Sequence, residues 1–281
     1  MAITLPAFTP AEESLFLTLG GRALDSRLPQ PFLGDTMADE ILNTVGYDLA
    51  SFPTLTGRLG DPRTKVFDIA VRAKRLDEIV GRYVIHHGDA VVLDLGAGLD
   101  NRMFRVNPPP GVGWYDIDFP TVIDLRAQVL PQRAGAHSIG ADLTDPGWLD
   151  GVPTDRPAVI VADGLVAFIT QDDFVSLLNR VLSHFPCGQL AFNLYTTYAI
   201  WALKHMPGLA AIAGAVANPG FDDPHQPERW AHGLTLAEEI FLTRAPEVAE
   251  LPLTVRLISR LASRSAAVSR IIGTTILRYC F

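Results

Sequence analysis

"VVLDLGAGLDNR", residues 91–102, is the stretch that decides the fold. Its apolar start has the length of a buried strand, and it continues into a turn with two glycines, Gly96 and Gly98. A strand that runs into such a turn is typical of α/β proteins that bind a nucleotide at the carboxyl edge of a parallel sheet, because glycine lets the backbone approach the ligand closely. The stretch predicts an α/β nucleotide-binding fold and raises the question of which ligand the turn holds.

Strand-like and helix-like segments alternate on both sides of this turn. Short apolar runs predict strands over residues 90–95, 111–118, 136–140, 157–163 and 189–195. Helical patterns lie between them, at residues 120–130 and 171–185. This alternation predicts a mostly parallel sheet with helices on both faces.

A helical addition is expected before the first strand. Residues 11–50 have the pattern of helices joined by a proline-rich loop. Over residues 64–83, helical spacing predicts an amphipathic helix whose buried face consists of Val66, Ile69, Ala70, Ala73, Leu76, Ile79 and Val80. We therefore expect one domain over 1–281, with a helical cap over 1–85 and a Rossmann-like core over 86–281.

Two later segments differ from this pattern. Residues 201–250 have an irregular pattern, and we treat 199–250 as an insertion near the site. Residues 251–281 contain no acidic residue and five arginines: Arg256, Arg260, Arg264, Arg270 and Arg278. They predict a helix with a solvated basic face followed by a final strand, and the alternative is a surface for anionic substrates, partners or lipid head groups.

The composition limits the classes of function. With 281 residues and 48% hydrophobic content, the chain can bury a substantial core. Its net charge of −8 argues against nucleic acid as a partner, because affinity for nucleic acid depends on neutralising phosphates with Lys and Arg. A small-molecule partner is expected, and the acidic chain with its basic tail is compatible with a homo-oligomer.

Neither metal sites nor export signals are expected. Cys187 and Cys280 show no spacing of a zinc site or disulfide framework. The first residues lack a basic region followed by an apolar core, so no secretory signal is expected. Lys204 and His205 interrupt the longest apolar stretch before it reaches the roughly 20 residues of a membrane span. We expect a cytoplasmic protein without a membrane span.

The glycine turn departs from a dinucleotide fingerprint. Asn101 occupies the position of the third glycine, and Asp100 would repel a pyrophosphate placed on the turn. The turn is thus expected to suit a ligand that brings positive charge. S-adenosylmethionine is such a ligand, because it joins a sulfonium and an amino group to an adenosine without phosphates. An NAD-dependent oxidoreductase remains the alternative at this point.

Acidic residues after later strands extend this hypothesis. Asp116 and Asp118 lie about twenty residues downstream, where an acid accepts hydrogen bonds from ribose hydroxyls in dinucleotide folds. Asp142 follows the third strand, where its carboxylate would accept from the adenine amino group, and Asp163 ends the fourth strand. Each of these acids is also what a helix N-cap or a turn requires.

The chain resembles a known family over nearly its whole length. The motifs that carry the resemblance are "VVLDLGAGLDNRMFRV", "WYDIDFPTVIDLR", "ADLTDPGWL", "VADGLVAFIT" and "HFPCGQLAFNLY". In order and spacing they resemble the leucine carboxyl methyltransferase family, in its bacterial branch of tetracenomycin-type polyketide O-methyltransferases. The resemblance implies a class I methyltransferase fold, a seven-stranded sheet whose last strand is antiparallel, and S-adenosylmethionine as methyl donor.

The resemblance also implies donor contacts at matching positions. The family's arginine that pairs with the methionine carboxylate falls on Arg72, and a basic N-terminal contact falls on Arg22. Without the resemblance, Arg72 would be assigned to a helix-face pair with Asp68. Asp163 stands where the family usually has glutamate. The other implied contacts are the turn at Gly96 and Gly98, the ribose acid Asp118, and the adenine contact at Asp142 and Leu143.

Acceptor contacts are expected after residue 190. An aromatic wall there would suit a planar polyketide or another aromatic acid, although ordinary core and loop aromatics would give the same pattern. The candidates are Tyr195, Tyr198, Trp201, His205, His225 and Trp230. A carboxylate acceptor, with a pKa of about 4, is ionised at neutral pH, whereas a phenol, with a pKa of about 10, benefits from a base. No catalytic base is predicted.

The sequence therefore favours an S-adenosylmethionine-dependent O-methyltransferase that acts on a carboxylate or phenol of a small molecule. A second hypothesis is a methyltransferase-like binding or regulatory protein, which the aspartate at position 163 leaves open.

Overall fold

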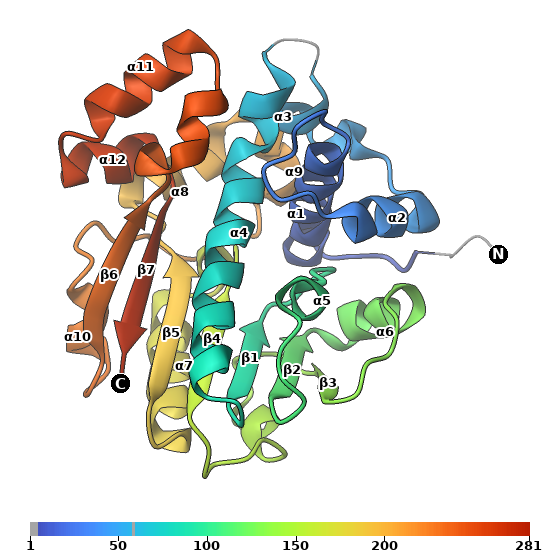
Figure 1. Ribbon diagram of the computed structural model, residues 1–281, viewed down its shortest axis with the longest axis vertical. Coiled ribbons are helices and arrows are strands. Elements are labelled where there is room, and N and C mark those ends of the chain that lie inside the picture. Colours follow the sequence, from blue (N-terminus) through green and yellow to red (C-terminus); the bar gives the residue numbers. More distant parts are fainter. Residues whose placement is uncertain (1–4, 58–59) are drawn as a thin grey trace.

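A seven-stranded sheet lies at the centre of the computed structural model, which describes residues 5–57 and 60–281 (Figure 1). The strands are β1 (Val91–Leu95), β2 (Gly113–Asp118), β3 (Ala136–Gly140), β4 (Ala158–Ala162), β5 (Gly188–Asn193), β6 (Thr235–Phe241) and β7 (Thr275–Cys280). Their order across the sheet is β3-β2-β1-β4-β5-β7-β6. β1 to β5 pair in parallel, and β7 runs antiparallel to both β5 and β6. This confirms the predicted fold class.

The predicted strands are confirmed, with ends that shift by one or two residues. β1 and β4 are buried along their whole length, because helices cover both faces of the sheet. Their side chains alternate between the two layers: Val92 and Val161 pack into one apolar cluster, while Leu93 and Ile160 pack into the other.

Helices cover both faces of the sheet. The long α4 (Pro62–His86) lies on one face, and all seven residues of its predicted apolar face are buried. α7 (Gln171–His184) packs on the opposite face. The short α5 (Arg102–Val106) contacts α4, and α6 (Pro120–Val129) packs beside β3. The carboxyl ends of the parallel strands thereby point toward one end of the molecule (Figure 1).

The N-terminal segment forms a helical layer above that end of the sheet (Figure 1). It contains α1 (Pro10–Ser26), α2 (Thr36–Val45), the 3-10 turn η1 (Leu49–Ser51) and α3 (Pro53–Thr56). A capping box between Thr9 and Glu12 fixes the start of α1, because each side chain accepts from the other's backbone N–H. The layer has an apolar core of its own, in which Phe16 and Leu19 are fully buried.

The irregular segment predicted for 201–250 is only partly irregular. It contains short helical pieces: the end of α8 (Thr197–His205), η4 (Pro207–Leu209), α9 (Ala210–Ala213), α10 (Gln226–Trp230), η5 (Leu242–Arg244) and η6 (Pro246–Glu250). Residues 235–241, however, form the edge strand β6, so the prediction is wrong there. Two more 3-10 turns, η2 (Pro146–Leu149) and η3 (Val166–Phe168), flank β4.

The C-terminal segment forms two helices instead of the predicted one. α11 (Leu253–Ala262) and α12 (Ala266–Ile272) precede the final strand β7, which is confirmed. The exposed surface of α11 is apolar as well as basic, which corrects the prediction of a merely solvated basic face. Within residues 5–57 and 60–281, no helix combines the length and the apolar character needed to cross a membrane.

Candidate active site

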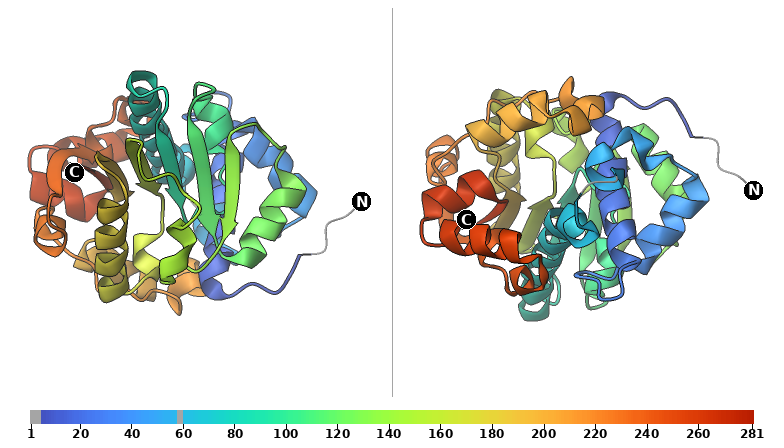
Figure 2. Two further views of the ribbon diagram at one scale, coloured as in Figure 1. Left: turned by 90° about the horizontal axis from the view of Figure 1, so that it is seen from below. Right: turned by 90° about the horizontal axis from the view of Figure 1, so that it is seen from above.

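A cavity of about 570 Å³ opens at the carboxyl edge of the sheet. Helices from three parts of the chain surround this end of the molecule: α1 and α3, α8 and α9, and α11 and α12 (Figure 2, right). The volume lies within the roughly 300–1,000 Å³ of typical small-molecule sites. Of the predicted donor contacts, this cavity brings together Arg22, Arg72, Gly96, Gly98, Asp118 and Asp163.

The glycine turn between β1 and α5 forms one part of the cavity wall. Gly96 and Gly98 adopt φ angles of +66° and +49°, in the left-handed region that glycine tolerates and other residues rarely adopt. A Cβ atom on Gly96 would lie 3.2 Å from Leu165, and one on Gly98 would lie 3.2 Å from Leu15. Only glycine therefore leaves this part of the cavity open and unstrained.

The glycine turn is held by two side chains from the next β-α unit. Asp118, at the end of β2, accepts a hydrogen bond from the Gly98 N–H at 2.7 Å through one oxygen and from the Phe119 N–H at 2.7 Å through the other. Arg126 on α6 donates to the carbonyls of Gly98 and Asp100, both at 2.8 Å. Burial raises the pKa of Asp118, and the two backbone N–H groups oppose that rise. The Asp118 carboxylate is thereby fixed at the cavity wall.

Asp100 does not act as the sequence suggested. Its buried carboxylate lies 2.8 Å from Arg105, 3.1 Å from Arg102 and 3.6 Å from Arg22. Burial raises the pKa of Asp100, but the three arginines outweigh burial and hold that pKa well below its usual value. The negative charge is thus neutralised by the protein itself, so the expected repulsion of a pyrophosphate by Asp100 is wrong.

Arg22 serves the same buried network. Its guanidinium donates to Asp35 at 3.2 Å and to the Leu99 carbonyl at 3.0 Å, and so joins α1 to the glycine turn. Asp35 also accepts from Asn101 and Arg105, both at 2.8 Å. Arg22 lines the cavity, but the groups to which it donates belong to the protein.

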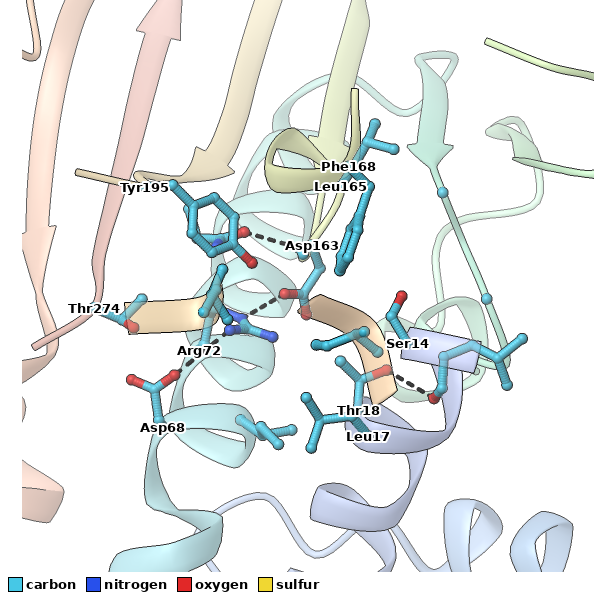
Figure 3. Close-up of a pocket in the computed structure, with 18 of the residues that line it drawn as sticks. Ser14, Leu17, Thr18, Asp68, Arg72, Asp163, Leu165, Phe168, Tyr195 and Thr274 are labelled. Atoms are coloured by element: carbon cyan, nitrogen blue, oxygen red, sulfur yellow. Dashed lines mark hydrogen bonds and ion pairs between the residues drawn. The ribbon is translucent and has the colours of Figure 1, made fainter. Parts of the chain in front are cut away.

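Arg72 and Asp163 face each other at the base of the cavity (Figure 3). Arg72 Nε donates to Asp163 at 2.5 Å, and its Nη1 lies 3.5 Å from Asp68. Both Arg72 and Asp163 lie largely out of water, and the ring of Tyr195 lies above the pair (Figure 3). The predicted helix-face pair of Arg72 with Asp68 is therefore present, and Arg72 also lines the cavity, where the contact with the donor carboxylate stays a prediction.

A fully buried arginine, Arg102, also contacts Asp163 at the base of the cavity. Arg102, the first residue of α5, contacts Asp94 at 2.7 Å, Asp77 at 2.9 Å and Asp163 at 3.5 Å. Burial raises the pKa of Asp94 to about 7; Asp100 adds to this rise and Arg102 opposes it. Asp94 lines the cavity two residues before Gly96, so a group that titrates near neutral pH lies beside the turn.

The upper part of the cavity is mainly apolar. Its wall is formed by α1, η3, α8 and α9, and it contains Leu17, Phe168, Tyr195, Tyr198, Leu203, Met206, Leu209 and Ile212. Polar groups there include Ser14 and Thr18 on α1, which face Asp163 across the cavity (Figure 3). Two of the predicted acceptor contacts, Tyr195 and Tyr198, belong to this wall.

The other predicted contacts lie outside the cavity. Asp116 accepts from Trp114 and Arg126 in the protein interior. Asp142 is exposed and caps its own turn through Thr144, while Leu143 packs in the apolar core. The placement of Asp116 follows from strand geometry: it points to the opposite face of β2 from Tyr115 and Ile117, as successive residues do.

The remaining aromatic candidates are likewise separate from the cavity wall. Trp201 and His205 stack on each other on the outer surface of α8, and Trp230 packs against the core beside Phe174 and Phe221. His225 is exposed and pairs with Glu228. Among the described residues, the cavity lining contains no histidine.

The contribution of the helical cap to this wall was not predicted from the sequence. Ser14, Leu17 and Thr18 lie at the spacing of one face of α1, and Lys65 lies seven residues before Arg72 on α4. The spacing of Lys65, Asp68 and Arg72 placed them on one helix face and could have identified this row. In the described part of the chain, no group of three potential ligands forms a metal site.

Comparisons with known proteins agree with this geometry. A family model described as leucine carboxyl methyltransferase matches residues 16–182. The chain is 39% identical over 242 residues to the tetracenomycin polyketide synthesis O-methyltransferase TcmP of Streptomyces glaucescens. The alignment covers 86% of this chain and 87% of the relative. It is 29% identical over 247 residues to the S-adenosyl-L-methionine-dependent methyltransferase dpfgK of Gibberella zeae, with 83% of each chain covered.

A solved structure supports the fold. The crystal structure of a candidate methyltransferase from Thermobifida fusca YX superposes with a TM-score of 0.51 at 16% identity, covering 92% of this chain and 93% of the other. At this level of identity the likeness shows the fold alone.

Proposed function

This chain belongs to the leucine carboxyl methyltransferase family and is a methyltransferase that uses S-adenosylmethionine, and on that premise we propose that it methylates an oxygen atom of an apolar small molecule. The observation that carries the proposal is one continuous cavity. It extends from the glycine turn and Asp118 to the apolar wall of α1 and α8. A donor and an acceptor can therefore share one enclosed space.

The residues at the base of the cavity fit such a donor. The open backbone at Gly96 and Gly98 leaves room beside the turn, Asp118 presents a fixed acceptor, and Arg72 presents a guanidinium suited to a carboxylate. We assign Arg72 to the donor carboxylate and Asp118 to the ribose hydroxyls. The donor supplies a methyl group already activated by its sulfonium. The task of the protein is then to orient the acceptor and exclude water.

The cavity lining favours an acceptor oxygen that is already ionised. No described lining residue is a histidine, and burial raises the pKa of the Tyr195 phenol, so Tyr195 is a poor base at neutral pH. Asp163 is paired with Arg72, and Asp94, whose pKa burial raises to about 7, is paired with Arg102. A carboxylic acid, whose pKa is ordinarily about 4, is already ionised and needs no base. We therefore propose a carboxylate as acceptor in preference to an unactivated phenol.

Lys65 provides a cation for recognising such an acceptor. It lines the cavity two helical turns before Arg72, and its ammonium donates to the Gly57 carbonyl. The arginines of the lining pair with carboxylates, whereas for Lys65 no carboxylate partner occurs among the described residues. The name of the relative TcmP refers to polyketide synthesis. We accordingly propose an aromatic polyketide acid or a similar aromatic carboxylate as the acceptor class.

A matched acceptor panel tests this proposal. The purified protein with S-adenosylmethionine is given aromatic carboxylic acids, the same ring systems with a phenol only, and the same acids blocked as methyl esters. We expect methyl esters to form from the acids only, as detected by mass spectrometry.

Lys65→Met is expected to raise KM for the acid roughly tenfold at similar kcat, because a charge-assisted contact made in both ground and transition states is lost. Lys204→Met, at an exposed lysine on α8, is the control.

The possible outcomes separate the hypotheses. Methylation of the phenols but not of the acids would overturn the carboxylate assignment. Binding of S-adenosylhomocysteine without turnover of any acceptor in the panel would favour the binding or regulatory protein over the enzyme.

Binding of S-adenosylhomocysteine is expected to depend on pH through Asp94. The pKa of about 7 leaves this carboxyl partly protonated in the free protein at neutral pH, and the ammonium group of a bound ligand favours its ionised form. Affinity should therefore rise with pH, by up to about tenfold per pH unit below pH 7, and become constant above about pH 8. Calorimetry in buffers of different ionisation enthalpy should detect one proton released on binding near pH 6.

The control for this prediction is Asp94→Asn, which should bind with little dependence on pH. An identical pH dependence in Asp94→Asn and the parent protein would exclude Asp94 as the titrating group.

A further inference from the structure

The outer surface of α11 presents apolar side chains to solvent. Leu253 and Leu261 are 64% and 62% exposed, and Leu257 and Ile258 are about half exposed. Leu253, Leu257 and Leu261 recur at every fourth residue and so form one stripe along the helix. The face of α11 that packs on the protein is formed instead by Val255, Ser259 and Ala262. A continuous exposed stripe of this kind marks an interaction surface.

A row of arginines runs beside this stripe. Arg256 and Arg260 are exposed on α11 with the same four-residue spacing, and Arg264 is exposed in the turn that follows the helix. No acidic residue occurs within residues 251–281, and in the described structure none of the three arginines makes an ion pair. Arg270 and Arg278 differ, because they pair with Glu239 and Glu238 on β6. The exposed row is therefore a local positive charge on a protein whose net charge is −8.

Apolar side chains are also exposed at the opening of the cavity. Ile271 and Ile272, at the end of α12, are each 52% exposed and also line the cavity. On the other side of the opening, Tyr198 of α8 and Met206, directly after the end of α8, are exposed and line the cavity as well. The view onto the carboxyl edge of the sheet shows α11 and α12 on one side of this end of the molecule and α8 across from them (Figure 2, right). The stripe, the arginine row and the rim thus form one surface, which we call the mouth surface.

The charge of the mouth surface decides which occupant it fits. A second copy placed symmetrically on this surface would bring two arginine rows together, and like charges at close range are unfavourable. An apolar stripe beside a basic row is instead the pattern of a helix that lies in the interface of an anionic membrane. Tyr198 on the rim and Trp201, which stacks on Tyr198 from the outer surface of α8, are exposed aromatic residues of the type that prefer the membrane–water boundary.

We propose that the mouth surface docks on an anionic lipid bilayer, with the opening of the cavity facing the lipid. The apolar side chains of α11 and α12 enter the acyl boundary, and the arginines contact lipid phosphates. Docking in this orientation lets an aromatic acid, whose ring system is apolar, pass between the bilayer surface and the cavity without its ring crossing water. This last step rests on the proposed function, whereas the docking itself does not.

Vesicle flotation with the full chain tests the docking. The probes are vesicles of phosphatidylcholine alone and vesicles of equal parts phosphatidylcholine and phosphatidylglycerol. We expect binding to the anionic vesicles only, with loss of affinity as salt is added. The double variant Arg256→Gln/Arg260→Gln should bind more than tenfold more weakly, because each basic residue near an anionic surface contributes about one factor of five. Leu257→Ser/Leu261→Ser should lose binding even at low salt.

The matched control is Arg82→Gln, at an exposed arginine near the C-terminal end of α4, which lies away from the mouth surface (Figure 1). It should bind like the parent protein. Equal binding to both vesicle types, no binding to either, or equal loss in Arg82→Gln would overturn the proposal. Self-association that Leu257→Ser/Leu261→Ser abolishes, with no binding to anionic vesicles, would assign the surface to a second copy. Binding of S-adenosylhomocysteine by each variant without vesicles keeps the docking result separate from the methyl transfer.

Discussion

Arg72→Ala is expected to weaken S-adenosylhomocysteine binding by about a hundredfold or more. Arg72 lies at the base of the cavity, with its guanidinium 2.5 Å from Asp163, and it is the side chain that we assign to the donor carboxylate. Loss of a buried, charge-assisted hydrogen bond costs about 2–5 kcal/mol, and about 3 kcal/mol corresponds to that factor. The variant also leaves the Asp163 charge facing the ligand's carboxylate. Isothermal titration calorimetry measures the change directly.

Arg82→Ala is the control for this variant, since Arg82 is exposed on the same helix. Arg72→Lys should recover part of the affinity because it keeps the charge but not the paired donor geometry. Unchanged binding in a folded Arg72→Ala protein, checked by circular dichroism, would remove Arg72 from the donor site and leave it as the partner of Asp163.

The largest effect on stability is expected for Arg102→Leu, with a loss of about 3–5 kcal/mol in the free energy of unfolding. The Arg102 side chain is completely inaccessible to solvent and contacts the carboxylates of Asp77, Asp94 and Asp163. Its removal leaves these buried charges without their shared counter-ion, which costs more than the ion pairs contribute when intact. Urea denaturation followed by circular dichroism measures the loss.

A double variant distinguishes this electrostatic cause from lost packing. Asp94→Asn removes one of the buried carboxyl groups that Arg102 contacts, so Arg102→Leu should cost less in the Asp94→Asn background than in the parent protein. Equal costs in the two backgrounds would assign the destabilisation to packing. If Arg102→Leu does not fold, Arg102→Lys provides the same comparison with a smaller perturbation.

Most of the fold could be predicted from the sequence because the spacing of apolar residues reflects which side chains are buried. The buried face of α4 and the strands β1 to β5 were predicted because fully covered strands and amphipathic helices repeat with different periods. β6 was missed because its residues, "TLAEEIF", include two glutamates, as an edge strand half open to water allows. On β6 these glutamates pair with Arg270 and Arg278, which are distant in the sequence.

The donor side of the site was more predictable than the acceptor side. Gly96, Asp118 and Asp163 follow different strands, and parallel strands bring their carboxyl ends to one edge. The acceptor wall depends on how α1 and α8 pack over that edge. This packing cannot be predicted from the local pattern of apolar and polar residues. The neutralisation of Asp100 depends on Arg22 from the distant α1 as well as on Arg102 and Arg105 from the adjoining α5.

Asp35 has a consequence for any attempt to re-engineer acceptor choice. The buried carboxylate of this cap residue accepts from Arg22 within the cap and from Asn101 and Arg105 beside the glycine turn. A chimaera that grafts a foreign cap at the cap–core boundary would leave the Asn101 amide without its acceptor and would remove one of the three carboxylates that Arg105 contacts, unless the graft carries an equivalent acid. The helical cap therefore cannot be exchanged as an independent unit in order to change acceptor specificity. Directed evolution should retain Asp35 and diversify the wall positions within α1, such as Leu17 and Thr18.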